Sequence, residues 1–187
     1  MTPILLAGPA SEPLSVDDVR AWLKLETRDE DALLSAMIKA ARSAVEQATR
    51  RALILQSWRL RLPRWPQEGE VRLPISPILA IDAVRRFDAA GNAVLVDLGA
   101  FNWSGSHLSL RRDSGVQGSL CFAVEIDVKA GYGANASDVP EALRQGMRML
   151  IAHWYAHRFE GLHEASVTHF PAGIAGLIMP YRQMRLR

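Results

Sequence analysis

The spacing of apolar residues predicts helices near the start of the chain. Ser15 and Asp18 form an S-x-x-D capping box, which predicts that a short helix covers residues 16–25. A long helix is predicted over residues 27–53, because acidic residues lie at its start and arginines at its end, as the helix dipole favours. Apolar residues recur in it at intervals of three and four, which predicts one buried face of Leu34, Ile38, Ala41, Val45 and Ala48.

In the middle of the chain the apolar period changes from about 3.6 residues to 2, which predicts strands. Residues 57–66 and 119–131 alternate apolar and polar positions, and the second run is the clearest strand pattern. Residues 77–87 and 93–98 flank a Gly-Asn pair, which is typical of a hairpin turn. The side chains that we expect on the buried faces are Trp58, Leu60, Leu62, Leu120, Phe122, Val124, Ile126 and Val128.

A glycine-rich segment, residues 129–145, leads from the last strand into a further helix. Such loops can bind phosphate, but the spacing here matches neither G-x-x-x-x-G-K-[ST] nor G-x-G-x-x-G. We expect instead that Asp138 caps the helix, with Glu141 as its capping-box partner and Pro140 in the first turn. Because these carboxylates would repel a phosphate, we predict no nucleotide cofactor at this loop.

The helix after this loop carries two histidines, His153 and His157, four residues apart on one stripe. Zinc hydrolases with the H-E-x-x-H pattern need a glutamate directly after the first histidine, where this chain has Trp154. The stripe lies beside an apolar arc and small residues. We therefore interpret the histidines as packing residues at a contact with a neighbouring helix or subunit.

Other candidate chemistry is sparse. His163, Glu164 and His169 match no standard zinc spacing, so we expect no metal and no cofactor. Cys121 is the single cysteine and lies in a predicted strand, which excludes an intrachain disulfide. A helix-turn-helix over residues 15–50 would bring the acidic run DED to the DNA backbone. A small metal-binding protein or hydrolase that uses the histidine pair, and a nucleic-acid-binding module, are kept as alternatives.

Composition indicates a folded protein with a sizeable core. The chain has 187 residues, of which 49% are hydrophobic and 22% charged, with a net charge of +2. This weak basic balance does not favour strong phosphate binding by bulk charge. No apolar run approaches the roughly 20 residues that span a bilayer, so we expect a soluble protein without a membrane partner. The N-terminal sequence MTPILLAGPASEP has no basic n-region, and we expect an extended arm.

The C-terminal part combines a short apolar helix with an arginine-rich tail. Its helix has barely two turns and is too short to be stable alone, so it must dock on its own domain or on a partner. Both interpretations stay open at this stage, and we expect the tail beyond it to be dispensable for the fold. The possible subunit or tail interface comprises Ile174, Leu177, Ile178, His153 and His157.

Three blocks of sequence, in this order, resemble the head–tail connector (adaptor) proteins of tailed phages, a family that includes adaptors of phage-derived gene transfer agents. Residues 14–62 resemble the opening of these proteins and residues 128–159 their third-helix segment. Residues 171–182, PAGIAGLIMPYR, are similar to their C-terminal signature. The chain departs from the family pattern at residues 104–119 and 160–169.

The resemblance implies a non-enzymatic structural subunit of a ring, usually of twelve copies, beneath the portal of the capsid. The implied partners are the portal protein, neighbouring copies of the chain, a tail-side stopper or tail-completion protein, and DNA that passes through without sequence readout. Assembly would occur in the host bacterial cytoplasm, and the final location would be the head–tail junction of a virion or virus-like particle. The implied portal interface comprises Pro180, Tyr181, Arg182, Met184, Arg185, Leu186 and Arg187.

We therefore expect an α+β fold, in which a small helical bundle carries an inserted antiparallel β-region. The bundle would consist of two N-terminal helices, one long later helix and a short C-terminal helix. A single adaptor domain would cover residues 1–187, organised as an extended arm (1–13), a helical core (14–55 and 138–180), a β-insertion (56–131) and a C-terminal tail (181–187).

Overall fold

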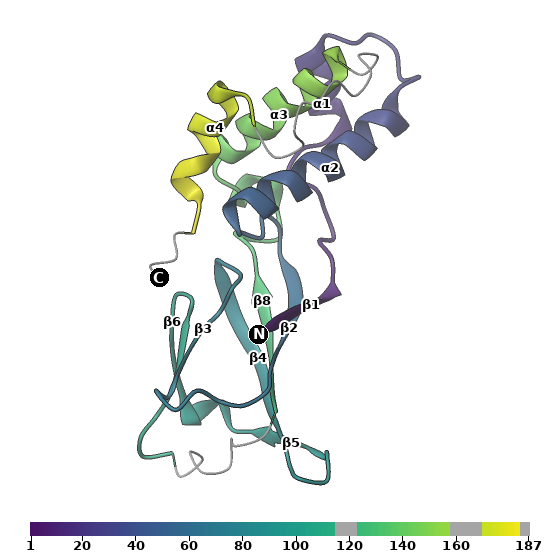
Figure 1. Ribbon diagram of the computed structural model, residues 1–187. Helices are drawn as coiled ribbons and strands as arrows, with labels where there is room; N and C mark the ends of the chain where they lie inside the picture. Colours follow the sequence, from purple (N-terminus) through teal and green to yellow (C-terminus); the bar gives the residue numbers. More distant parts are fainter. Residues whose placement is uncertain (115–122, 158–169, 184–187) are drawn as a thin grey trace. The chain divides into compact units, whose positions relative to one another are not determined.

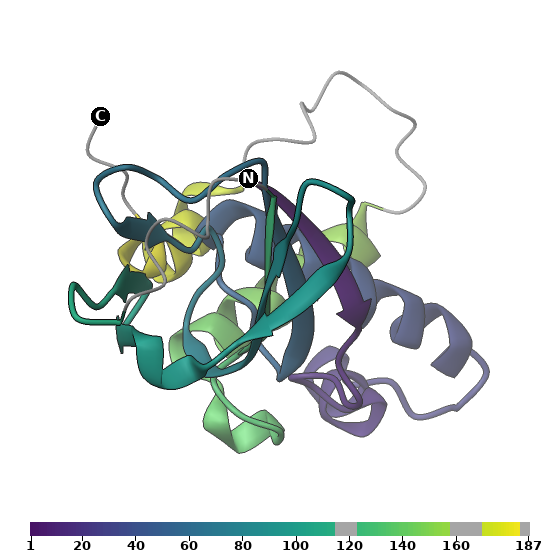
Figure 2. The same cartoon turned by 90° about the horizontal axis from the view of Figure 1, so that it is seen from below.

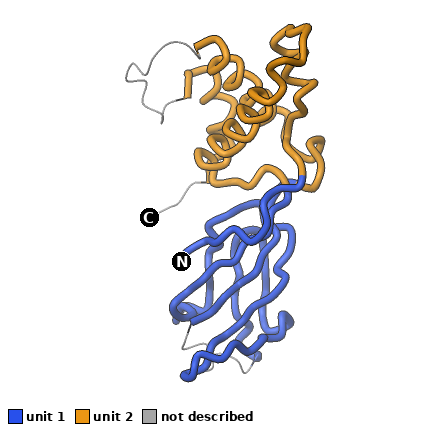
Figure 3. The backbone as a smooth tube through the Cα atoms, turned by 90° about the vertical axis from the view of Figure 1, so that its right-hand side faces the viewer, with its two compact units in different colours: residues 1–10, 55–132 blue, residues 11–54, 133–187 orange. Residues whose placement is uncertain are grey.

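The computed structural model describes residues 1–114, 123–157 and 170–183 of the chain. The chain divides into two compact units (Figure 3). Unit 1 comprises residues 1–10 and 55–132 and contains the strands, whereas unit 2 comprises residues 11–54 and 133–187 and contains the α-helices. Helices and antiparallel strands are both present, so the predicted α+β class is confirmed.

Unit 2 has the predicted succession of helices in its described part (Figure 1). The long helix α3 contacts each of the other three α-helices. A single 3₁₀ turn, η4, follows directly on the last α-helix. The helices are α1 (Val16–Leu23), α2 (Asp31–Thr49), α3 (Glu141–Ala156) and α4 (Ala172–Ile178), and η4 covers Met179–Tyr181.

The predicted capping box at the start of α1 is confirmed, because Ser15 and Asp18 exchange side-chain and backbone hydrogen bonds. The second helix, α2, is shorter than predicted at both ends. Before it, Asp31 donates its N–H to the carbonyl of Arg28 in a turn, and the helix begins only at Asp31. At its end, Arg50 takes the left-handed conformation (φ 58°, ψ 33°), which stops the helix after Thr49.

The predicted cap of the third helix is wrong. The helix α3 begins at Glu141, and Pro140 precedes it without any side-chain cap. Asp138 instead closes the separate 3₁₀ turn η3 (Ala136–Asp138), where its carboxylate accepts a hydrogen bond from the backbone N–H of Asn135 at 2.9 Å. The physical reason is the proline, because it disfavours helical geometry in the preceding residue, and Val139 is extended (φ −79°, ψ 130°).

The core of unit 2 forms where apolar faces of its helices meet. The predicted face of α2 is buried except at Ala48, which is half-buried, while the neighbouring Thr49 is fully buried. From α3 and α4, Met147 and Ile178 are also completely buried. The other buried apolar side chains of this unit are Leu14, Val19, Leu34, Ile38, Ala41, Val45, Ala52, Leu53, Ile54, Val139, Leu143, Leu150, Ile151 and Ile174.

Unit 1 contains a five-stranded antiparallel sheet in the order β1-β2-β8-β4-β5 and a three-stranded antiparallel sheet in the order β3-β7-β6 (Figures 1 and 2). The large sheet is made of β1 (Thr2–Ala7), β2 (Gln56–Leu62), β8 (Val124–Ala130), β4 (Ile78–Phe87) and β5 (Ala93–Val96). The small sheet is made of β3 (Glu70–Arg72), β7 (His107–Leu110) and β6 (Phe101–Ser104).

Register explains which side chains of the large sheet are buried. Leu60, Ile126 and Val84 lie opposite one another on β2, β8 and β4, and all three are fully buried. The small sheet contributes Val71 and Leu108, which are also paired and buried. Because side chains alternate between the two faces of a strand, the residues between these positions form a polar face.

The β-region agrees only in part with the predicted strands. The hairpin between β4 and β5 is confirmed, and Gly91 in its turn has φ +84°, which glycine adopts without strain. Residues 2–7 are extended and pair with β2, a pairing that the sequence did not predict. The small sheet was also missed, and Trp58 is only half-buried. The expected core residues Leu120 and Phe122 lie outside the described residues.

Candidate functional site

The last described residues, 180–183, which we call the C-terminal segment, are attached to the end of α2. After η4, the backbone N–H of Gln183 donates a 3.0 Å hydrogen bond to the carbonyl oxygen of Thr49. In return, the Nε of Arg51 donates a hydrogen bond to the carbonyl oxygen of Tyr181. Residues up to Gln183 are therefore part of the structure of unit 2.

The reason for this attachment is that helix ends leave carbonyl groups without partners inside the helix. The helix α2 ends at Thr49 and η4 ends at Tyr181. A donor that follows each end bonds the last carbonyl of the other: Gln183 donates to Thr49, and Arg51 donates to Tyr181. Thr49 is fully buried, and its hydroxyl donates to the carbonyl of Val45 at 2.7 Å. The same hydroxyl accepts a 3.3 Å hydrogen bond from the N–H of Arg51. These bonds fix the end of α2 on which the C-terminal segment lies.

Three arginines, Arg50, Arg51 and Arg182, lie on the two segments that these hydrogen bonds join, and we call them the arginine cluster. Arg50 and Arg182 are exposed, and Arg51 is half-buried. Within the described part of the chain, no carboxylate forms an ion pair with any of the three. By contrast, the nearby Arg42 pairs with Glu12 at 2.8 Å and with Glu46 at 2.9 Å. The exposed members of the cluster are thus Arg50 and Arg182, whereas the Nε of Arg51 is bonded to Tyr181.

The predicted portal-interface residues are only partly within the described chain. Pro180 and Arg182 are exposed, and Tyr181 is half-buried. The remaining predicted residues, Met184, Arg185, Leu186 and Arg187, lie outside the described residues. The sequence did not predict that Thr49 and Arg51 would hold this segment in place.

The apolar face of α4 lies mainly against its own unit. Ile174 is 2% exposed and Ile178 is 0% exposed, so these two side chains close the core of unit 2. Leu177 is half-buried and keeps part of its surface accessible. Of the two interpretations left open for this helix, docking on its own domain therefore accounts for Ile174 and Ile178 in the isolated chain.

The two histidines of α3 are neighbours at the end of the helix. The rings of His153 and His157 have centroids 4.4 Å apart, and the Nδ1 of His157 lies 2.7 Å from the carbonyl oxygen of His153. Both residues are exposed in the single chain, so packing of these histidines against another subunit stays a prediction. Among the described residues, no group of three or more His, Cys, Asp or Glu side chains could hold a metal ion. The further candidates His163, Glu164 and His169 lie outside the described residues.

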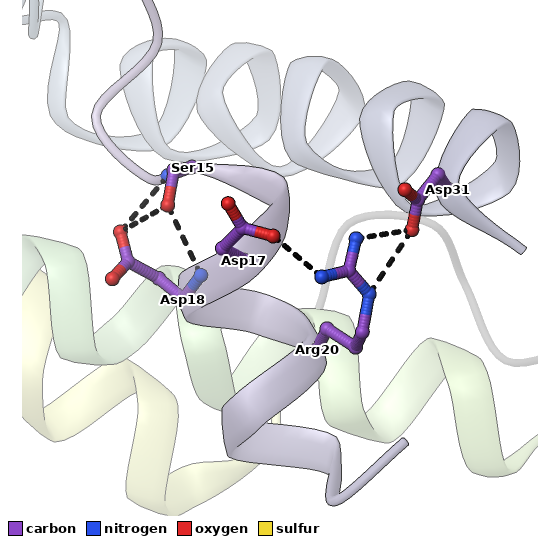
Figure 4. A network of polar contacts seen from close by, with 5 residues as sticks. All are labelled: Ser15, Asp17, Asp18, Arg20 and Asp31. Atoms are coloured by element: carbon purple, nitrogen blue, oxygen red, sulfur yellow. Dashed lines mark hydrogen bonds and ion pairs between the residues drawn. The ribbon is translucent and has the colours of Figure 1, made fainter. Parts of the chain in front are cut away.

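A polar network joins the starts of α1 and α2 (Figure 4). The side chain of Arg20, only 13% exposed, pairs with Asp17 on its own helix and with Asp31 at the start of α2. Hydrogen bonds from the side chain and backbone of Ser15 hold the pKa of Asp18 below its usual value. Asp18 therefore acts as a helix cap, and Asp17 and Asp31 act as ion-pair partners of Arg20.

A second network crosses the polar face of the large sheet. Asp127 on β8 accepts hydrogen bonds from Arg59 on β2, at 2.7 and 2.9 Å, and from Arg85 on β4, at 2.5 Å. These hydrogen bonds, the one from Arg59 above all, lower the pKa of Asp127 below its ordinary value. Asp127 lies on the polar face of β8, where an exposed side chain is expected. It is only 8% exposed, and Arg59 and Arg85 bond to it from the two neighbouring strands.

The edge strand β1 exposes an unusual amount of apolar surface. Ile4, Leu5 and Leu6 are 45–49% exposed, and all six residues of the strand are exposed. At the opposite edge of the same sheet, Leu95 of β5 is 69% exposed. Exposed apolar edge strands are commonly covered by another chain in an assembly.

The comparison with known proteins shows the family of this chain. The sequence matches the head completion protein family over residues 12–184. This is nearly the whole chain, and the chain belongs to that family. The prediction that it is a member of the head–tail connector proteins is thereby confirmed.

Solved structures with a similar fold come from gene transfer agent (GTA) particles. A chain in the neck of an empty GTA particle, computed with C6 symmetry, is 30% identical, with a TM-score of 0.78. Chains from the virion of a native GTA particle (28% identity, TM-score 0.77) and from the neck of a native particle computed with C12 symmetry (27%, 0.76) are also similar. Each comparison covers 100% of this chain and 98% of the other. No curated protein matches the sequence.

The candidate site is thus a set of protein surfaces. In the described part of the chain, no helix is both long enough and apolar enough to span a membrane. The feature with the most definite geometry is the C-terminal segment on the end of α2, together with the arginine cluster.

Proposed function

We propose that this chain is a structural head–tail connector subunit that forms a ring beneath the capsid portal, joins the portal to the tail and lines the DNA passage. The observation that carries the proposal is similarity over 100% of the chain, at 30% identity, to a protein in the neck of a GTA particle. Membership of the head completion protein family supports the same role. The location that follows is the head–tail junction of a virion or virus-like particle.

A ring of identical copies is supported by the symmetry of the related structures. The necks that contain the similar chains were computed with C6 and C12 symmetry, which supports the proposed twelve copies. In a closed ring each copy uses two different surfaces, one toward each neighbour. The exposed apolar edges of the large sheet, β1 and β5, are two such surfaces on opposite sides of one sheet.

The proposed contact with the portal comprises the C-terminal segment and the residues that follow it, 184–187. Tyrosine and arginine are enriched in the residues that contribute most to protein interfaces, and Tyr181 and Arg182 lie where the segment leaves unit 2. Their attachment to α2 supports the proposal, because a segment that is already ordered loses less conformational entropy on binding.

The proposed role is non-catalytic, and DNA is a passing partner. A net charge of +2 suits a channel that DNA must leave as readily as it enters, because tight phosphate binding needs many cationic contacts. Attachment of a tail-side stopper or tail-completion protein on the other side of the ring completes the proposed set of partners.

Deleting the gene in the bacterium that produces the particles tests this function. We expect heads that contain DNA but carry no tails, and recovery of tailed particles when the wild-type gene is supplied in trans. Electron microscopy of purified particles measures the tailed fraction. A normal fraction of tailed particles in the deletion strain would contradict the proposed function.

A further inference from the structure

The end of α2 and the C-terminal segment form one surface with arginines from both. We propose that the arginine cluster, Arg50, Arg51 and Arg182, binds carboxylate groups of the protein that receives the C-terminal segment, and that Thr49 and Arg51 position this segment for binding. The inference rests on the proposed function, in which that protein is the portal. It adds the end of α2, a region 130 residues away from Tyr181 in sequence, to the interface.

The C-terminal segment has little structure of its own. Within η4, the N–H of Arg182 donates to the carbonyl of Met179 at 3.0 Å, and Pro180 has no N–H to donate. Besides the contacts of η4 with α2 and α4, two hydrogen bonds at the end of α2 hold the segment, from Gln183 to Thr49 and from Arg51 to Tyr181. Removing the donor on Arg51 would loosen the segment without removing any part of the apolar core.

Four other arginines of unit 2 have carboxylate partners, whereas Arg28, like the cluster, has none among the described residues. Arg20 and Arg42 each pair with two carboxylates, and Arg144 and Arg148 both pair with Glu141. The cluster has no such partner among the described residues, although guanidinium groups match carboxylates with two parallel hydrogen bonds. Three like charges are tolerated here because they lie at the C-terminal ends of α2 and η4, where the carbonyl dipoles favour cations.

The side chains next to the arginines indicate which kind of partner this surface binds. Next to the arginines lie the half-buried ring of Tyr181, the exposed Pro180 and the side chain of Met179, which is 46% exposed. Arginine mixed with aromatic residues and methionine is typical of protein interfaces, whereas nucleic-acid surfaces rely on dense positive charge. We therefore assign the surface to carboxylates on a protein and not to DNA phosphates.

A binding experiment with DNA-free heads tests the charge of the cluster. Heads purified from cells that lack the chain are emptied of DNA, treated with nuclease and mixed with the purified full-length protein, and bound protein is measured after sedimentation. The double variant Arg50→Glu/Arg182→Glu should bind at least about tenfold more weakly than wild type, since loss of a paired charge at an interface commonly exceeds 1.4 kcal/mol. The matched control Arg28→Glu/Lys39→Glu makes the same charge change at exposed positions of unit 2 and should bind like wild type.

The positioning role has its own variant. Arg51→Lys keeps the positive charge but lacks the Nε donor that bonds Tyr181. We expect weaker binding to the heads, faster hydrogen exchange at the amide of Gln183 and a fall in melting temperature that is smaller than the fall caused by deleting residues 180–187. If Arg51→Lys binds like wild type and Gln183 exchanges at the wild-type rate, Arg51 does not position the segment.

The remaining outcomes separate this inference from the proposed function. If wild-type protein does not bind the heads, the proposed function is overturned, and the inference with it. If wild type binds and the double variant binds equally well, only the inference is overturned. If the double variant docks normally but loses affinity for a short double-stranded DNA, the cluster is a DNA-binding surface, and the assignment to protein carboxylates is wrong.

Discussion

Gly146 of α3 lies so close to Ile178 of α4 that a Cβ atom added to the glycine would be 2.8 Å from the Cγ2 of the isoleucine. Such a distance is shorter than carbon atoms tolerate. Both residues are buried, so the isoleucine could move only by displacing its neighbours in the core of unit 2. This contact holds α4, and with it the start of the C-terminal segment, against the core of unit 2.

Substitution of Gly146 tests this contact. Alanine at a helical glycine normally adds up to about 1 kcal/mol of stability. At Gly146 we expect the opposite, a loss of about 1–3 kcal/mol, because the added methyl overpacks the core. Gly176 of α4 is the control, since a Cβ there meets nothing within 4 Å, and Gly176→Ala should stabilise the protein. Urea unfolding measures both variants, and equal effects would contradict the proposed close packing of α3 and α4.

The lowered pKa of Asp127 predicts that the protein loses stability in acid. The hydrogen bond from Arg59, followed by that from Arg85, makes the folded-state pKa of Asp127 lower than its unfolded value, which is ordinarily 3.8. The stabilisation is therefore complete above this ordinary value, and it is lost as the pH falls through the lower folded-state pKa. Below that range Asp127 is protonated in both states and contributes nothing by this route.

The variant Asp127→Asn isolates this effect, because the other carboxylates with lowered pKa values are common to both proteins. We expect the wild-type protein to exceed the variant in unfolding free energy near neutral pH, and the difference to shrink as the pH falls below the ordinary aspartate value. Denaturant unfolding at a series of pH values measures the difference. A gap that stays constant with pH would show that the carboxylate charge does not matter.

Two truncations distinguish residues 184–187 from the C-terminal segment, which is attached to α2. The sequence alone predicts that removing residues 180–187 spares the fold, but the bonds of Tyr181 and Gln183 to α2 change this expectation. We expect that deletion to lower the melting temperature, whereas deletion of residues 184–187 should leave it unchanged. Both should reduce the tailed fraction of particles if the proposed portal contact is correct. Identical melting temperatures for the two truncated proteins would show that the bonds to α2 are dispensable.

The histidine pair should not bind a metal. His153 and His157 offer two imidazoles, and the described residues supply no third ligand, whereas zinc sites in proteins use three or four. We expect His153→Ala/His157→Ala to have the same metal content and thermal stability as wild type. Elemental analysis of both purified proteins is the measurement. Stoichiometric zinc in wild type that disappears in the variant would revive the alternative of a metal-binding protein.

The sequence predicted those elements of the fold that depend on local patterns. The capping box of Ser15 and Asp18, the buried face of α2 and the hairpin with Gly91 each arise from residues close together in the chain. The error at Asp138 also has a local cause, because Pro140 forces Val139 into an extended conformation and separates η3 from α3.

The missed elements depend on distant partners. The small sheet has strands of three or four residues, and its register joins Val71 to Leu108 across 37 positions. The strand β1 contains Pro3 and no alternating pattern, so the sequence predicted only an extended arm here, and its pairing with β2 depends on residues 50 or more positions away. In the same way, the near-complete burial of Asp127 requires arginines from two other strands.

The candidate site shows the same division. Through its resemblance to a family the sequence indicated the segment from Pro180 to Arg187, of which the structure describes residues 180–183. Membership of the head completion protein family is established by the match over residues 12–184. No local pattern could indicate that Arg51 would bond Tyr181, because the two residues are 130 positions apart. The arginine cluster appears only when these segments are brought together.

The central claim is that this chain is a ring-forming subunit at the head–tail junction, with its C-terminal segment toward the portal. Cryo-electron microscopy of purified particles, reconstructed at the neck and fitted with this structure, tests it most directly. The predicted result is a ring of twelve copies directly beneath the portal, with Tyr181 and Arg182 in contact with portal side chains. Absence of the chain from the neck would contradict the claim, as would a ring whose C-terminal segments face away from the portal.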